Sequence, residues 1–333
     1  SLFCIHHSAF CFMSCRALIS GVSGFVGGFL AGHLLECGDA VLGTSPDGRW
    51  MAASPEAVRD RVDVLAWDLA NPGGPSEDVR QALEQFAPTV IYHLAAISVP
   101  GDCGHEEPSP LAVRINVDGT RRVLALAASL PSSPRVLFIS SSYVYAPVTA
   151  DHPRVDETWP VTPKRGYGRT KLAAEEAVRL AVAEDQVDAM IARAFQHTGP
   201  GQSPRMMLSE WAFQFAQGGP EPVKVHTQDA WIDLTDVRDV VRAYRLLALH
   251  GERGEVYNVG SGIARRTGDI LELLRHAADP TRPVVELRPG FKQDPIANIT
   301  RLTHRTGWQP GIPVEQTVQD ALCWWLKRAP HAG

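Results

Sequence analysis

Tyr167 and Lys171 stand four residues apart in a stretch of helical apolar spacing that runs from Tyr167 to Ala183. Residues four apart share one face of a helix, so the lysine ammonium group can lie beside the phenol and favour its ionised form. Such a tyrosine, whose pKa is ordinarily about 10, can give or take a proton near neutral pH. The chain contains five lysines in all, so this pairing is conspicuous and predicts acid–base chemistry.

Three consecutive serines, Ser140 to Ser142, end a predicted strand at Arg135–Ser142. A hydroxyl group at the end of a strand can hydrogen-bond a reacting oxygen and orient it for proton transfer. The pattern predicts a serine in the site and leaves open which of them has this role.

A glycine-rich loop, Gly21 to Gly27, lies between a predicted strand at Arg16–Ser20 and a predicted helix at Phe25–Cys37. Glycines at this spacing allow a tight turn and a close approach of the backbone to a pyrophosphate, which the helix N-terminus attracts. The loop therefore predicts a dinucleotide-binding site. The residues expected to contact the dinucleotide here are Gly21, Ser23, Gly24, Phe25, Val26 and Gly27.

The residue after the second predicted strand bears on the choice of dinucleotide. An acid that binds the ribose of NAD is expected there, but Ser45 occupies the position and Arg49 follows. Hydroxyl and guanidinium groups accept the 2′-phosphate of NADP, so the sequence favours NADP. NAD stays open, because Asp47 could reach back to a ribose. The residues placed to contact the adenine are Asp68 and Leu69.

Apolar runs that look like strands alternate with helical segments as far as about residue 195. The strands are expected at residues 16–20, 40–44, 62–67, 89–96, 135–142 and 189–195, and the main helices at 25–37, 110–129 and 167–183. Near-continuous apolar strands separated by helices are typical of a parallel sheet covered on both faces. The expected fold class is α/β, with a Rossmann-type doubly wound parallel sheet.

Gly/Pro-rich stretches break this alternation after residue 195 and predict a smaller, discontinuous α/β substrate-binding lobe. The expected division begins with an N-terminal extension at residues 1–14. The dinucleotide-binding domain follows at 15–195, and segment 233–262 returns to it. The lobe is expected to consist of 196–232 and 263–330.

The composition excludes several classes of protein. The 333 residues carry a net charge of −5 and no long basic run, so no nucleic-acid partner is expected. No apolar stretch approaches the roughly 18 residues of a membrane span. The six cysteines show no metal-site spacing, and no signal-peptide pattern is present. We expect a cytoplasmic enzyme with reduced cysteines and no bound metal.

Taken together, these motifs resemble the extended short-chain dehydrogenase/reductase family, over residues 15–328. Further matching stretches are His93–Ala96, Asn116–Thr120, Tyr257–Gly262 and Thr306–Trp308. The resemblance implies a catalytic triad of Ser141, Tyr167 and Lys171, with Ser142 competing for the place of Ser141. It implies cofactor contacts from Leu94, Ala95, Ala96, Asn116, Ser140, Tyr167 and Lys171, and substrate contacts from Ser142, Tyr143, Gln196 and Arg288. It also implies a homodimer built on helices 110–129 and 167–183.

Within this family the chain is most similar to the GDP-4-keto-6-deoxy-D-mannose reductases, through Arg193–Gln202, Asp233–Asp239 and Leu287–Pro289. Three positions depart from that pattern. Gln196 replaces an asparagine, Ile232 replaces an arginine and Phe291 replaces a glutamate. All three belong to the expected substrate pocket, so they put the nucleotide and the sugar in doubt, but not the redox centre.

The resemblance leaves three reactions to separate. Dehydratases of the family carry an acidic residue after the catalytic serine or threonine, whereas Ser142 and Tyr143 stand here. Epimerases mostly hold NAD through the acid that Ser45 replaces. The sequence therefore favours an NAD(P)H-dependent reductase of a nucleotide-linked 4-keto-6-deoxy sugar. A nucleotide-sugar 4-epimerase and a non-catalytic cofactor-binding scaffold remain as alternatives.

Overall fold

A parallel sheet of seven strands forms the centre of the molecule in the computed structural model, which describes residues 14–51, 54 and 56–329. From edge to edge the strands are β11 (Val256–Val259), β7 (Ala189–Ala194), β5 (Arg135–Ser141), β4 (Val90–His93), β1 (Arg16–Ser20), β2 (Ala40–Ser45) and β3 (Val64–Ala66). Every neighbouring pair is parallel. The order reverses between β1 and β4, and ligands of such sheets bind at the carboxyl ends of the strands beside that point. The predicted doubly wound sheet is confirmed.

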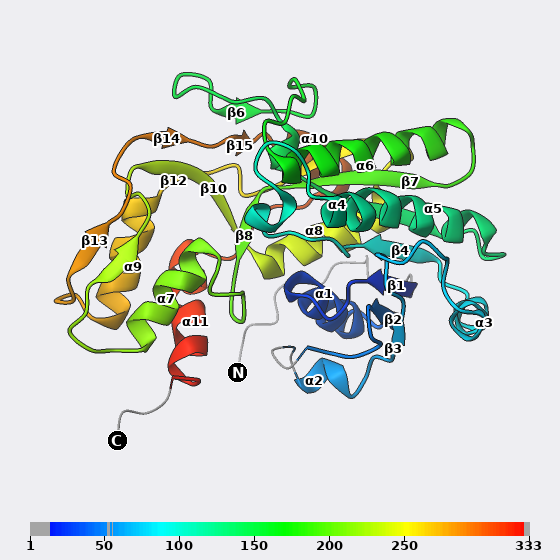
Figure 1. Ribbon diagram of the computed structural model, residues 1–333, viewed down its shortest axis with the longest axis horizontal. Coiled ribbons are helices and arrows are strands. Elements are labelled where there is room, and N and C mark those ends of the chain that lie inside the picture. Colours follow the sequence, from blue (N-terminus) through cyan, green and yellow to red (C-terminus); the bar gives the residue numbers. More distant parts are fainter. Residues whose placement is uncertain (1–13, 52–53, 55, 330–333) are drawn as a thin grey trace.

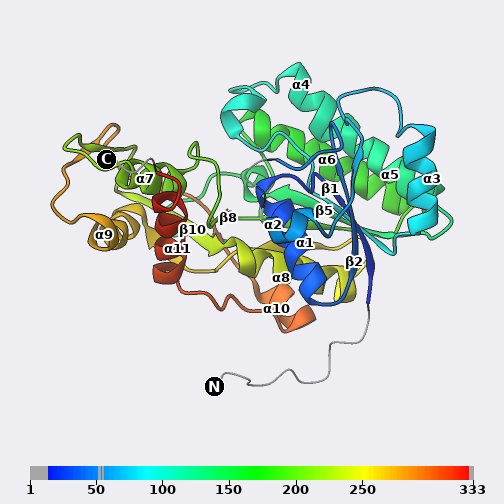
Figure 2. The ribbon, with the colours of Figure 1, turned by 90° about the horizontal axis from the view of Figure 1, so that it is seen from below.

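Helices cover both faces of this sheet (Figures 1 and 2). One hydrophobic core holds α1 (Phe25–Glu36), α8 (Val237–His250) and α10 (Thr300–Thr306) against one face. The other holds α3 (Glu77–Phe86), α5 (Gly119–Ser129) and α6 (Gly166–Ala183) against the opposite face. Neighbouring residues of β1 enter different cores, which explains why the strands are apolar without alternation.

The helix expected over residues 110–129 is not uniform. It consists of α4 (Pro110–Ala112), a π-helix, η2 (Val113–Asp118), and then α5. Single π-turns often lie at functional sites, because the extra residue in the turn redirects a side chain. Here the π-turn contains Asn116, one of the predicted cofactor contacts.

Local signals explain where other elements begin and end. Gly38 follows α1 with φ of +81° and donates to the carbonyl oxygen of Leu35, while the amide of Asp39 donates to that of Leu34. These two bonds form a Schellman motif. Ser76 caps α3 by accepting a hydrogen bond from the amide of Val79.

A second group of strands surrounds β10 (Ala230–Asp236). β12 (Ala264–Arg266) pairs with it antiparallel, and β14 (Lys292–Gln293) and β8 (Gln196–Thr198) pair with it in parallel. Two further parallel pairs lie nearby, β9 (Val223–Val225) with β13 (Val284–Glu286), and β6 (Arg154–Val155) with β15 (Ile296–Ala297).

Three helices, α7 (Met207–Ala216), α9 (Thr267–Ala278) and α11 (Val314–Leu326), share a separate hydrophobic core with β9 and β10. They gather at one end of the molecule, away from the parallel sheet (Figure 1). The remaining short elements are α2 (Glu56–Arg59), η1 (Pro100–Cys103) and η3 (Ser142–Val144). No helix in the described part of the chain is long and apolar enough to cross a membrane.

Candidate active site

Tyr167 and Lys171 both lie in the first two turns of α6, buried against the parallel sheet. The ammonium Nζ of Lys171 donates a 2.7 Å hydrogen bond to the carbonyl oxygen of Ile139 on β5 and lies 5.1 Å from the ring centroid of Phe138. Burial lowers the pKa of Lys171 to about 8. The lysine is therefore fixed to the sheet and still largely charged at neutral pH.

Tyr167 does not behave as its spacing from Lys171 predicts. Burial raises the pKa of the phenol, and a hydrogen bond with Ser141 opposes that rise. The expected net lowering does not occur, because desolvation outweighs any effect of the Lys171 charge, whose ammonium group donates to Ile139. Tyr167 therefore holds its proton at neutral pH and is poised as a proton donor.

The serine run divides at the end of β5. Ser141 lies beside Tyr167, and its hydroxyl oxygen also accepts a 3.3 Å hydrogen bond from the amide of Tyr143 at the start of η3. Ser140 instead donates a 2.6 Å hydrogen bond to Glu175. The donor capacity of this hydroxyl is thus used within the protein, and its predicted cofactor contact stays a prediction. The geometry thus favours Ser141 over Ser142 as the partner of the tyrosine.

A buried ion pair that the sequence analysis missed supports this arrangement. Glu175 follows Lys171 by one turn of α6, and its two carboxylate oxygens accept hydrogen bonds from Nε and Nη2 of Arg193 at 2.9 and 2.8 Å. Glu175 is 0% and Arg193 2% exposed. The bidentate pair ties α6 to β7 and, through Ser140, to β5. The signal available in the sequence was an acid four residues after Lys171.

Close packing also places α6. A side chain at Gly168 would clash with the carbonyl oxygen of Tyr143, so only glycine lets α6 approach η3 this closely. The rings of Tyr143 and Tyr167 meet edge to face with centroids 5.6 Å apart. Tyr143 is 38% exposed, so its ring lies between the buried phenol and solvent.

The glycine-rich loop fits a pyrophosphate. Gly21 has φ of +78°, and a Cβ there would lie 2.8 Å from the backbone of Ala95. A Cβ at Gly27 would lie 2.6 Å from the carbonyl oxygen of Val22. Gly24 precedes α1 without a side-chain cap, which leaves the first amides of the helix available to an anion. The residues around this cradle are Ser23, Phe25 and Val26 in the loop and helix, and Leu94, Ala95 and Ala96 after β4.

Beyond β2 the chain makes a tight turn that uses Ser45. Ser45 is 2% exposed, and its hydroxyl oxygen accepts a 2.9 Å hydrogen bond from the amide of Arg49. The Asp47 carboxylate accepts from the same amide. Ser45 thus shapes the turn, while the guanidinium of Arg49 forms no ion pair within the residues that the structure covers. Arg49 is the better placed of the two for a 2′-phosphate.

Three other residues that were predicted to contact the cofactor form hydrogen bonds or pack with other residues of the chain. Asn116 is 1% exposed, and its amide bonds both the N–H and the carbonyl oxygen of Ile97, at 2.8 and 3.1 Å. It therefore positions the loop after β4. The Asp68 carboxylate accepts from the amide of Ala70, and Leu69 lies in the core below α5. Any contact from these residues to an adenine is confined to backbone atoms or the free carboxylate oxygen.

Gln196, a predicted substrate contact, has a partner that the sequence analysis missed. Gln196, on β8, donates a 2.9 Å hydrogen bond to Asp294, which follows β14 and pairs with Lys292 at 3.0 Å. No pattern in the sequence links Gln196 to Asp294, which lies 98 positions later in the chain. Arg288 is exposed after β13, and its backbone amide bonds the carbonyl oxygen of His226, so no contact in the structure ties it to the triad.

Two of the substituted positions also have clear surroundings. Ile232 is 2% exposed in the core beneath α7 and α11, where it packs as an ordinary apolar residue. Phe291 is 58% exposed.

His93 is buried between Ser20 and Thr120, and burial lowers its pKa to about 3. It is neutral and structural, and not a catalytic base.

Comparisons with known proteins agree with this geometry. The model of the NAD dependent epimerase/dehydratase family matches residues 17–260. GDP-6-deoxy-D-mannose reductase of Pseudomonas aeruginosa is 29% identical over 95% of this chain and 99% of the relative. UDP-glucose 4-epimerase of Mycolicibacterium smegmatis is 28% identical over 92% of this chain and 97% of the relative.

The structure of RMD from Pseudomonas aeruginosa complexed with NADPH superimposes with a TM-score of 0.77. It is 28% identical and covers 94% of this chain and 99% of its own. The expected resemblance and the expected nicotinamide dinucleotide cofactor are thereby confirmed. With the glycine cradle, the tyrosine–lysine helix and this match over most of its length, the chain belongs to the NAD dependent epimerase/dehydratase family.

Proposed function

We propose that the protein is an NADPH-dependent reductase of a nucleotide-linked 4-keto-6-deoxy sugar, of the GDP-4-keto-6-deoxy-D-mannose type, acting in the cytoplasm as a homodimer. The observation that carries the proposal is the buried phenol of Tyr167 on α6, with the Ser141 hydroxyl beside it and Lys171 one turn further along the helix. Reduction of a ketone needs a proton donor at the oxygen, and a tyrosine with a raised pKa starts in the donor form. The likeness to the Pseudomonas reductase supports the same substrate class.

The residues have separate tasks in this proposal. The bound dinucleotide supplies the hydride that reduces the C4 ketone. Tyr167 gives its proton to the developing alkoxide, and Ser141 hydrogen-bonds that oxygen. The charge of Lys171 stabilises the phenolate that remains until solvent returns the proton. Tyr143, Gln196 and Asp294 line the side from which the sugar enters.

Two features weigh against the other reactions. A 4-epimerase keeps its dinucleotide through two hydride transfers, and Ser45 stands where an acid would hold the ribose of NAD. A dehydratase needs a further acid beside the serine, where Ser142 and Tyr143 stand. Ser45 in place of an acid, with Arg49 forming no ion pair to any described residue, supports NADP over NAD.

NADPH oxidation with GDP-, dTDP-, UDP- and CDP-linked 4-keto-6-deoxy sugars tests the proposal, followed by product stereochemistry at C4. We expect turnover with at least one of them, and a loss of about 10²-fold or more in Tyr167→Phe with NADPH binding retained. Tyr244→Phe is the matched control, because the Tyr244 hydroxyl is buried and has no hydrogen-bond partner among the residues that the structure describes.

Three outcomes would contradict the proposal. Interconversion of ordinary nucleotide sugars without net NADPH oxidation would establish an epimerase. NADPH binding without any turnover would establish a scaffold protein. Full activity of Tyr167→Phe would refute the assignment of the proton donor.

The proposed homodimer is supported by exposed apolar residues on α4 and α6, which lie in the two helical segments expected to form it. Leu111 of α4 is 43% exposed and Leu180 of α6 is 58% exposed. Light scattering of the purified protein should give twice the chain mass, and Leu180→Glu should shift it toward the monomer. A monomer in the wild-type protein would refute this part.

A further inference from the structure

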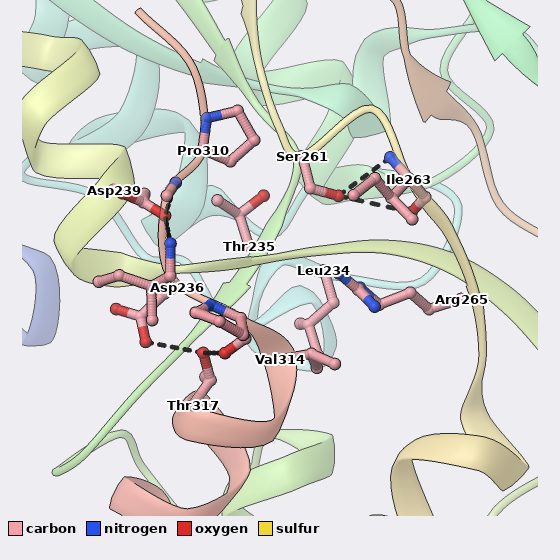
Figure 3. Close-up of a pocket in the computed structure, with 13 residues that line it drawn as sticks. Leu234, Thr235, Asp236, Asp239, Ser261, Ile263, Arg265, Pro310, Val314 and Thr317 are labelled. Carbon is pink, nitrogen blue, oxygen red and sulfur yellow. Dashed lines mark hydrogen bonds between the residues drawn. The ribbon is translucent and has the colours of Figure 1, made fainter.

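A cavity of about 190 Å³ lies beyond the end of β12, between the last residues of β10, the loop after β11 and the segment that leads into α11 (Figure 3). Its walls include Leu234, Thr235, Ser261, Arg265 and Val314. None of the proposed catalytic, cofactor or substrate residues lines it. It is therefore separate from the candidate active site.

Two polar groups that face this cavity have no partner among the described residues. Thr235 is 3% exposed, and its hydroxyl makes no hydrogen bond within that part of the chain. Nε of Arg265 is also buried and unpaired, and its guanidinium forms no ion pair with any residue that the structure describes. Figure 3 shows the Arg265 side chain extending from β12 toward Leu234, with the Thr235 hydroxyl above the strand. Buried polar groups left unpaired in this way are costly and point to an absent partner.

The acids in the wall do not cancel this positive charge, because each is already paired. Asp236 accepts hydrogen bonds from Arg238 at 2.8 and 2.7 Å and from the Thr317 hydroxyl at 2.8 Å. Asp239 accepts from Arg242, Gly311 and Ile312, each at 2.8 Å. The guanidinium of Arg265 remains as the uncompensated charge of the cavity.

The N-terminus of α11 adds to the attraction for an anion. The helix has 13 residues, and its first turn, with Val314 and Thr317, borders the cavity. Its N-cap residue, Pro313, has no side chain that can cap the free amides. A helix N-terminus of this length favours negative charge at its first turn.

We propose that this cavity binds a compact oxyanion, the phosphate or carboxylate group of a small metabolite. The planar fork of Arg265 can hold two oxygens, the Thr235 hydroxyl can donate to a third, and the α11 amides add positive potential. The site goes beyond the proposed reductase function and does not depend on it.

Calorimetric titration with inorganic phosphate and, separately, malonate tests the proposal. The protein is first saturated with NADP⁺, so that the glycine-rich loop is not available to phosphate. We expect saturable binding of at least one probe at one site per chain, and the better probe identifies the head group. Arg265→Gln and Thr235→Val should each weaken that binding, by about tenfold or more for the arginine.

Arg266→Gln is the matched control, because it removes the same charge one residue away, where Arg266 pairs with Asp229 outside the cavity. It should bind as the wild type does. Thr235→Val keeps the shape of the side chain, so it tests the site even where Arg265→Gln disturbs the fold. Absence of saturable binding to both probes, or binding that neither substitution weakens, would overturn the proposal.

Discussion

Gln196 donates a hydrogen bond of 2.9 Å to the carboxylate of Asp294, which joins the start of β8 to the segment after β14. Lys292 pairs with the same carboxylate at 3.0 Å. Burial and then the charge of Asp294 raise the pKa of the neighbouring Tyr143 phenol, while Lys292 opposes them. Asp294 therefore organises the polar groups on the side of the site where we expect the sugar.

Asp294→Asn should raise KM for the nucleotide sugar by about tenfold and change kcat much less. The substitution removes the charge that orients Lys292 and weakens the hold on Gln196, but it leaves the triad intact. Steady-state kinetics at saturating NADPH measures both constants. Asp151→Asn, at an exposed acid, is the control. An unchanged KM would show that the sugar does not bind beside Asp294.

Ser141→Ala should lower kcat by about 10²-fold, whereas Ser142→Ala should change it only a few-fold. Of the two hydroxyls, that of Ser141 contacts Tyr167, so its removal takes away the donor that orients the reacting oxygen. Single-turnover reduction with each variant measures the chemical step. The opposite ranking of the two variants would transfer the role to Ser142.

The catalytic rate should fall as pH rises through about 8, the pKa to which burial lowers Lys171. The charged lysine is present below that pH and is lost above it, so activity should drop by about tenfold per unit at higher pH. Tyr167 does not add to this limb, because its own pKa is raised.

The same pH profile measured on Lys171→Arg checks the assignment. The guanidinium stays charged throughout, so the variant should show lower activity without the alkaline decline. A wild-type profile that is flat to pH 10, or a decline that persists in Lys171→Arg, would exclude Lys171 as its source.

Gly27→Ala should weaken NADPH binding by about tenfold or more, because its Cβ would lie 2.6 Å from the carbonyl oxygen of Val22 and would push the cradle open. Gly32→Ala, in the same helix, is the control. Its Cβ would meet Val58 at an ordinary 3.5 Å, so binding should be kept and unfolding should cost about 0.5–1 kcal/mol more. Fluorescence titration and urea unfolding measure the two effects. Equal NADPH affinity in both variants would refute the close approach.

Features that depend on residues close together in the sequence could be predicted, whereas features that depend on contacts between distant segments could not. The parallel strands, the helix that carries Tyr167 and Lys171, and the loop at Gly21 were predictable, since each depends on periodicity or on spacing within one or two turns. The π-turn at Asn116 was not, because it depends on how that amide fits against Ile97. The pairing of Gln196 with Asp294 had no local signal at all.

By itself, the sequence determined the family and the chemical groups, because the glycine cradle and the tyrosine–lysine helix are local patterns. Tertiary structure decided how those groups behave. It directed Lys171 to Ile139, selected Ser141 and not Ser140 to face Tyr167, and buried the phenol so that it keeps its proton. It also left Nε of Arg265 without a partner among the described residues, at the cavity that Thr235 lines. Desolvation and side-chain direction depend on neighbours from distant segments, and spacing along one chain does not contain them.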